Sequence, residues 1–155
     1  MLITTHTILG GTIGNLTKDP YLTIPLSFSA HYLVDSLPHF EVSSFRKPND
    51  RNLKPKNWFE IFFVGVDILF SIFLILILRK FWSLSFFLGI AFGVLPDFLD
   101  NIFLWSSYLR KLPIFKDLYS LHKNFHFTAR KNTLLLGILI QVFIIGFCFL
   151  LLKVI

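Results

Sequence analysis

The chain has 155 residues, of which 54% are hydrophobic and only 15% are charged. A soluble domain carries about 25% charged residues, so the composition excludes an ordinary soluble protein and indicates an integral membrane protein of one domain. The net charge of +6 does not indicate a nucleic-acid partner. The positive residues gather between the apolar segments, as the positive-inside rule produces in membrane proteins.

The first forty residues predict a helical hairpin. Residues 2–16 and 24–40 form two segments that are shorter or more polar than a membrane span, joined by a turn at 17–20. The start of the chain has no Lys or Arg before its apolar run and no clear cleavage site, so we expect it to belong to the fold and not to a secretory signal. The pairs Gly10/Gly14 and Gly89/Gly93 form GxxxG patterns, which are typical of close helix packing.

Three later segments are long enough to cross a bilayer, which needs about 20 apolar residues. They cover residues 58–78, 84–108 and 133–152. The polar segments 41–57 and 109–132 hold most of the Lys and Arg residues, which places both segments and the N-terminus in the cytoplasm. We therefore expect residues 1–155 to form a single all-α domain, a multi-pass bundle of about five helices in the inner membrane.

Histidines and aspartates cluster inside this apolar chain. Members of each cluster are three or four residues apart, so each cluster lies on one face of a helix. His and Asp at such spacing are typical metal ligands, and acids inside a membrane segment are costly unless they have a function. We predict that the metal ligands are His6, His31, Asp35, His39, Asp97, Asp100, His122 and His126.

Topology and charge both favour a shared metal centre. At a helix rise of about 1.5 Å per residue, every candidate ligand falls in the cytoplasmic half of the bundle. Up to four carboxylates in a low-dielectric region would repel one another unless cations balance them. We expect two or three divalent ions as cofactors, with zinc favoured and manganese or iron as alternatives, because mixed His/Asp sets discriminate poorly between these metals.

Several further residues carry separate expectations. Asp67 lies roughly 15 Å deep in its helix, and we predict a catalytic role, either as a further ligand or as the base that orients the attacking water. Lys123 and Arg130 follow the last histidines and are candidates to bind a substrate phosphate, although the positive-inside rule also accounts for them. Glu41 and Glu60 are expected to be solvent-facing or interfacial.

Four motifs together resemble a known family. They are Thr5-His6, the run from His31 to His39, Leu95-Pro96-Asp97-Phe98-Leu99-Asp100, and the pair His122 and His126. This pattern is similar to small bacterial inner-membrane proteins described as metal-dependent hydrolases, which are thought to be distant relatives of zinc-dependent phospholipase C. Compared with the family pattern, the late histidines here are one residue closer together and have no glycine between them.

The sequence and the resemblance lead to one main hypothesis and two alternatives. The main hypothesis is a membrane-bound, metal-dependent hydrolase of a phosphoester, with a lipid or lipid-linked substrate favoured by the depth of the site. The first alternative is an ion, proton or metal transporter that uses intramembrane Asp and His residues. The second is a membrane scaffold whose metal site is only structural. The sequence leaves the substrate and the oligomeric state open.

Overall fold

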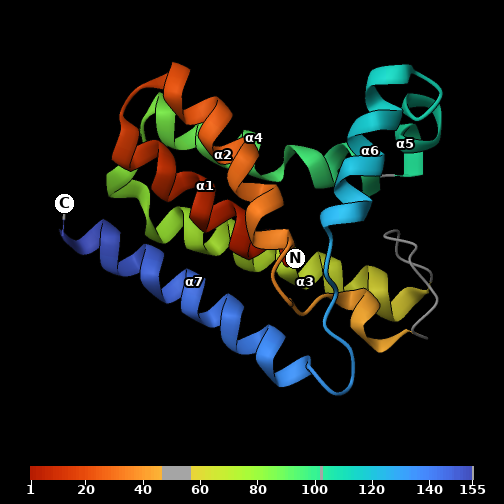
Figure 1. The fold of residues 1–155 in the computed structure, drawn as a ribbon. Coiled ribbons are helices and arrows are strands. Elements are labelled where there is room, and N and C mark those ends of the chain that lie inside the picture. The colour runs from red at the N-terminus through yellow and green to blue at the C-terminus, as the bar shows by residue number, and fades with distance from the viewer. Residues whose placement is uncertain (47–56, 102, 155) are drawn as a thin grey trace.

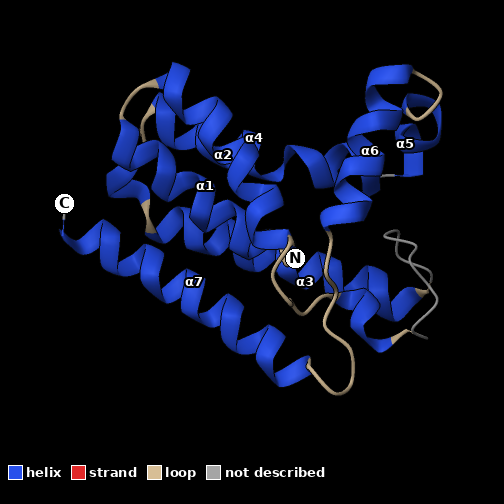
Figure 2. Cartoon of the chain, in the orientation of Figure 1, coloured by secondary structure: helices blue, strands red, loops and turns tan. Residues whose placement is uncertain are grey.

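The computed structural model describes residues 1–46, 57–101 and 103–154, and in this part of the chain the elements are helices joined by loops (Figures 1 and 2). Its α-helices are α1 (Ile3–Thr17), α2 (Pro20–Asp35), α3 (Trp58–Ile77), α4 (Leu84–Asn101), α5 (Phe103–Leu109), α6 (Pro113–Phe125) and α7 (Leu134–Val154). Two 3₁₀ turns, η1 (Val42–Phe45) and η2 (Arg79–Phe81), complete the described elements. The all-α prediction is confirmed.

The described helices number seven, more than the expected five. The segment 84–108, expected to be one span, is covered by α4 and α5, which lie on either side of residue 102 (Figure 1). The segment 109–132, expected to be a cytoplasmic loop with a short helix that carries the late histidines, contains the thirteen-residue helix α6. Pro113 is its first residue, where a missing backbone N–H costs no hydrogen bond.

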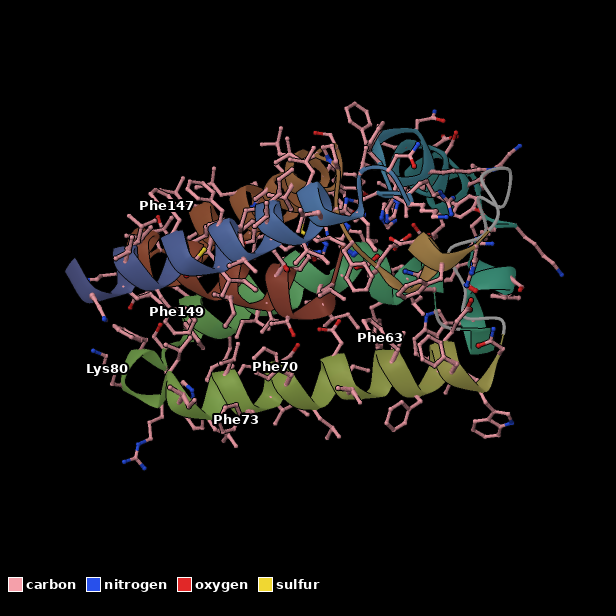
Figure 3. All side chains as sticks on the ribbon, turned by 90° about the horizontal axis from the view of Figure 1, so that it is seen from below. Phe63, Phe70, Phe73, Lys80, Phe147 and Phe149 are labelled. Atoms are coloured by element: carbon pink, nitrogen blue, oxygen red, sulfur yellow. The ribbon has the colours of Figure 1, made fainter. Side chains whose placement is uncertain are left out.

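Three helices are long and apolar enough to cross a membrane: α3, α4 and α7. Their outer surfaces carry large apolar side chains, and Phe70, Phe73 and Phe147 are each about half exposed (Figure 3). The interior is the reverse, because the buried described residues comprise nine hydrophobic and twenty polar or charged residues. An apolar exterior around a polar interior suits a protein surrounded by lipid, which agrees with the membrane prediction.

Helix α1 lies at the centre of the bundle and contacts α2, α3, α4 and α7 (Figure 1). Lys18 is the C-cap residue that follows α1, and its φ is positive, at 52°. Its N–H donates a hydrogen bond to the carbonyl of Gly14. Asp19 then caps α2 by accepting from the N–H of Tyr21, and Pro20 opens the helix. These residues form the turn expected at 17–20.

The two GxxxG patterns bring the backbones of α1 and α4 into direct contact. A Cβ atom on Gly10 would lie only 2.7 Å from the carbonyl carbon of Gly89, and one on Gly89 would lie 2.8 Å from that of Gly10. One on Gly14 would meet the backbone of Ser85 at 2.6 Å. Real Cβ atoms do not approach backbone so closely, so the prediction of close packing is confirmed.

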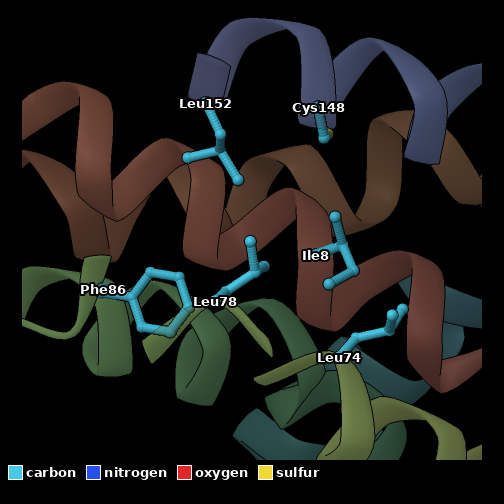
Figure 4. Packing of buried hydrophobic residues seen from close by; sticks show 6 residues of the cluster. All are labelled: Ile8, Leu74, Leu78, Phe86, Cys148 and Leu152. Atoms are coloured by element: carbon cyan, nitrogen blue, oxygen red, sulfur yellow. The ribbon is translucent and has the colours of Figure 1, made fainter. Parts of the chain in front are cut away.

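The apolar core is small and lies among α1, α3, α4 and α7 and the turn after α3 (Figure 4). Its buried members are Ile8, Leu74, Leu78, Phe86, Cys148 and Leu152. The buried core residue of α1 is Ile8, which lies two residues after the buried His6. The apolar core and a cluster of buried polar residues therefore adjoin along α1.

We expect Gly89→Ala to destabilise the protein by about 1–3 kcal/mol or more, because the added methyl group meets backbone that cannot move aside. Gly65→Ala in α3 is the matched control, since a Cβ there has nothing within 4 Å and helix propensity favours Ala by about 1 kcal/mol. Thermal unfolding in detergent measures both. Equal unfolding midpoints for the two variants would contradict the close-packing interpretation.

Candidate metal centre

Four helices and two connecting segments meet at the polar end of the bundle. His6 comes from α1, His31 and Asp35 from α2, and Asp97 from α4, while α6 carries His122. The chain segments that follow α2 and α6 pair with each other over a few residues: the N–H of residue 127 donates to the carbonyl of residue 35, and that of residue 129 to the carbonyl of residue 39. This pairing places the two remaining histidines, His39 and His126, side by side with ring centroids 4.5 Å apart.

The Nε2 atoms of all five histidines converge on the carboxylate of Asp35. Its distances to these atoms are 3.2 Å for His6, 3.4 Å for His31, 4.0 Å for His39, 3.1 Å for His122 and 3.7 Å for His126. Asp35 is fully buried. It also accepts a hydrogen bond of 2.9 Å from the α-amino group of Met1. One carboxylate is thus the centre of the whole cluster.

The opposite ring nitrogens, Nδ1, are held by the surrounding protein in four of the five histidines. That of His31 lies 2.8 Å from the carbonyl of Gly93, and that of His39 lies 2.9 Å from the carbonyl of Leu37. Nδ1 of His122 lies 2.7 Å from the carboxylate of Asp100. The fourth, in His126, lies 3.2 Å from the hydroxyl of Thr128. A histidine whose Nδ1–H is donated to the protein presents a free Nε2 lone pair, which is the usual arrangement at metal sites.

The ligand atoms form two overlapping groups. His31, Asp35, Asp97 and His122 place one ligand atom each within 4.8 Å of one another, and Asp35, His39 and His126 do the same. Six of the eight predicted metal ligands are therefore brought together, and Asp35 belongs to both groups. His6 lies against the same carboxylate. This buried His/Asp cluster could hold a metal ion.

Asp100 occupies a different place from the one expected of a direct ligand. Its carboxylate contacts the far nitrogen of the His122 ring, and it belongs to neither ligand group. Carboxylates in this position orient a metal-binding histidine and raise its basicity. Spacing alone put Asp97 and Asp100 on one face of α4, but it could not show that a histidine ring comes between Asp100 and the centre.

Glu41 is the residue that the sequence reasoning missed. Its side chain is only 13% exposed and lies 3.4 Å from Nε2 of His126, so the expectation that it faces solvent is wrong. The hydroxyl groups of Ser43 and Thr128 both donate to one of its carboxylate oxygens, which leaves the other directed at the histidine. Its position two residues after His39 was the available signal. Glu60, also expected at the surface, is buried against Arg46.

Burial and charge set the protonation of the cluster. Burial alone would lower the pKa of His122, but hydrogen bonds to Asp100 and Asp35 outweigh it and raise the pKa to about 10. Burial and the nearby Met1 ammonium group lower the pKa of His39 to about 3. Burial opposes ionisation of Glu41, yet His126 and the same ammonium group hold its pKa at about 2. In the absence of metal, protons on His122 and Met1 supply the positive charge that the carboxylates require.

Unpaired buried atoms provide a test of whether these residues suit a metal. Both ring nitrogens of His6 and Nε2 of His39 are buried without a hydrogen-bond partner. A buried polar atom without a partner costs about 1–3 kcal/mol. Nε2 of each of these rings is directed at Asp35, so a cation bound beside this carboxylate would satisfy both. The residues present therefore fit a divalent ion.

Asp67 is not brought to the cluster. Its carboxylate accepts hydrogen bonds from the backbone N–H groups of Ile3 and Thr4, at 2.7 and 3.2 Å, and from the Thr4 hydroxyl at 2.6 Å. These are the free N–H groups at the start of α1, so Asp67 caps a neighbouring helix. The prediction from its depth was a catalytic role or a further metal ligand, whereas the described contacts of its carboxylate are with the start of α1.

The two residues predicted to bind phosphate differ in their surroundings. Arg130 donates to the backbone carbonyls of Ser43 and Arg46, at 2.7 and 3.2 Å, and so ties the segment after α6 to the 3₁₀ turn η1. Lys123 is exposed beside His122 and remains available to solvent or to a ligand. Arg110 donates to the carbonyl of Asp100 at 2.6 Å and lies over the Tyr119 ring.

Comparison with protein-family models, with curated proteins and with solved structures gives no match to this chain. The resemblance described above therefore stays an expectation, and the case for function depends on the geometry of the centre.

We expect Asp67→Asn to lower stability by about 1–3 kcal/mol, because the carboxylate that caps α1 is lost, and to leave bound metal at the wild-type level. Thermal unfolding and elemental analysis of the same preparation measure the two effects. Asp117→Asn, at an exposed position on α6, serves as the control. Loss of metal at unchanged stability would show that Asp67 is a ligand after all.

Proposed function

We propose that this protein is a multi-pass inner-membrane hydrolase that binds two divalent metal ions, or three, at the cluster around Asp35. The observation that carries the proposal is the convergence of five histidine Nε2 atoms within 4.0 Å of one buried carboxylate. A structural hydrogen-bond network needs no such set of inward lone pairs, and it would not leave buried ring nitrogens unpaired.

The two overlapping ligand groups support a dinuclear arrangement. His31, Asp97 and His122 would hold one ion, and His39, His126 and Glu41 the other, with Asp35 between them and His6 beside it. Zinc suits this mixture of imidazole and carboxylate ligands, and manganese and iron are the alternatives. Bound ions of this kind supply Lewis acidity toward a phosphoryl oxygen and lower the pKa of a water that attacks it.

The protein's own residues would position and charge-balance this chemistry. Asp100 fixes the orientation of the His122 ring, and Ser43 and Thr128 fix that of the Glu41 carboxylate. Lys123, exposed next to His122, is placed to attract an anionic substrate. In the proposed hydrolysis the P–O bond to the leaving alcohol breaks, the water oxygen bonds to phosphorus, and the proton from the water ends on the alcohol.

Charge distribution supports a cytoplasmic position for the centre. The end of the bundle that carries it includes Arg46, Arg110, Lys111, Lys116, Lys123, Arg130 and Lys131, whereas Lys18, Arg79, Lys80 and Lys153 lie toward the other end. The positive-inside rule then directs the first end to the cytoplasm. A transporter would need titratable groups across the full depth of the bilayer. Asp67 is the predicted functional carboxylate that lies outside the cluster, and it accepts a hydrogen bond from the N–H of Ile3 at the start of α1. This structural contact disfavours the transporter alternative.

Elemental analysis of detergent-purified protein tests the proposal. We expect at least two equivalents of metal in the wild type, near-complete loss in Asp35→Asn, and loss of about half in either Asp97→Asn or Glu41→Gln, because each of the latter removes a ligand of one ion only. Asp117→Asn should match the wild type. Preparations of wild type that contain no stoichiometric metal would overturn the proposal.

Activity separates a catalytic centre from a structural one. Metal-loaded wild type should hydrolyse phosphoesters presented in mixed micelles, and Asp35→Asn should lose at least about 100-fold in rate, as is typical when metal coordination is disrupted. A stable metal complement without hydrolysis of any phosphoester or carboxylic ester would instead support the scaffold alternative.

Metal affinity should rise with pH. Because the pKa of His122 is raised to about 10, this ring is protonated at neutral pH in metal-free protein, and binding must displace that proton. We expect apparent affinity to increase up to tenfold per pH unit between about pH 6 and 9, measured by competition with a chelator. Asp100→Asn, which removes the hydrogen bond that raises the pKa, should flatten this dependence. A pH-independent affinity in the wild type would contradict the assignment of His122.

A further inference from the structure

A shallow apolar groove runs between α2, α4 and α6 beside the metal-centre cluster. It is lined by Phe28, Tyr32, Pro96, Leu99, Phe115 and Leu118, with Asp100 at its polar end. Asp100 is the only one of these lining residues that was predicted to bind metal. The other six have no part in the chemistry of the centre. The groove is therefore a feature that the proposed reaction leaves unexplained.

The inner end of the groove touches the cluster. The Tyr32 ring contacts the rings of His31 and His122, at centroid distances of 5.4 and 5.8 Å. Asp100 accepts from the same His122 through its carboxylate. A molecule that lies in the groove would therefore have its polar end next to the residues that hold one proposed ion.

Two of the helices that form the groove carry exposed apolar side chains on their other faces. On α2, Leu22, Leu26 and Leu33 are 54%, 49% and 68% exposed, and on α4, Phe98 is 47% exposed. Since α4 is one of the three helices able to cross a membrane, hydrocarbon chains are the surroundings expected for these faces. An apolar groove between such helices that ends at a polar centre suits a lipid chain better than a soluble ligand.

We propose that the groove between α2, α4 and α6 binds the alkyl chain of a membrane lipid and presents the lipid's phosphate-bearing head group to the Asp35 cluster. The exposed side chains of Lys116 and Lys123 on α6 favour an anionic head group. The turnover of that head group rests on the proposed function, whereas the binding of the chain does not. Substrate would enter sideways from the bilayer and not from the cytoplasm.

Photolabelling measures chain binding directly. The full chain is reconstituted in phosphatidylcholine vesicles with phosphatidylglycerol that carries a diazirine midway along one acyl chain, and labelled peptides are identified by mass spectrometry. We expect labels on α2 and α6 at the groove, and a fall of at least fivefold in Leu118→Trp, which fills it. Ile114→Trp, on the same helix but 73% exposed, should label like the wild type.

Labels confined to the outer faces of α3 and α7, or groove labels that Leu118→Trp leaves unchanged, would overturn the proposal. Phe28→Trp fills the groove from the opposite wall and decides the question if Leu118→Trp does not fold. Wild-type metal content in each variant shows that the centre itself is intact.

Turnover separates this inference from the proposed function. Filling the groove should slow hydrolysis of a long-chain phosphoester about tenfold or more and leave a short, water-soluble phosphoester unchanged. Equal slowing of both substrates would contradict the proposal that the groove binds the alkyl chain, but it would be consistent with the proposed hydrolase activity. Labelling at the groove in a wild-type protein that hydrolyses neither substrate would contradict the proposed hydrolase activity, but it would support the binding of an alkyl chain in the groove.

Discussion

The close contact between α1 and α4 is the constraint on which the rest of the structure depends. Glycines on both helices remove every Cβ from the crossing, so that Gly10 and Gly89 meet backbone to backbone. In lipid, helices gain little from apolar association, and small residues that allow such contact are a main source of affinity. Because His6 lies one turn before Gly10 and Asp97 lies two turns after Gly89, the same contact places these two side chains 3.7 Å apart.

A central helix without an apolar face requires its partners to satisfy its polar groups. Thr4 bonds to Asp67 and Ser71 on α3, and Thr5 bonds to Gln141 on α7. Two helices whose outer surfaces are almost wholly apolar thus each contribute a polar residue to α1. Such bonds fix the rotation of α1 about its axis, and rotation decides whether His6 faces the cluster. Asp67 is one of several groups that hold the start of this helix.

Helix periodicity was enough to predict much of this arrangement, but contacts between distant segments were not accessible to it. The spacing of His31 and Asp35 correctly indicated a shared face of α2, and the GxxxG patterns indicated the α1–α4 contact. For His39 and His126 the prediction of a shared helix face is wrong, because α2 ends at Asp35 and α6 ends at Phe125. The roles of Asp67, Asp100 and Glu41 depend on which group of another helix lies opposite each carboxylate.

The carboxylates of the centre explain why so many basic groups surround Asp35. A buried charge requires compensation by opposite charge or by hydrogen bonds, and here the Met1 ammonium and the His122 imidazolium provide it within 3.1 Å. Each of these two groups carries a proton on nitrogen that a divalent cation would displace on binding. The same groups would thus stabilise the bundle without metal and leave room for a metal, and the unpaired nitrogens of His6 and His39 favour the metal-bound state. The balance between these two states would set the affinity for a metal.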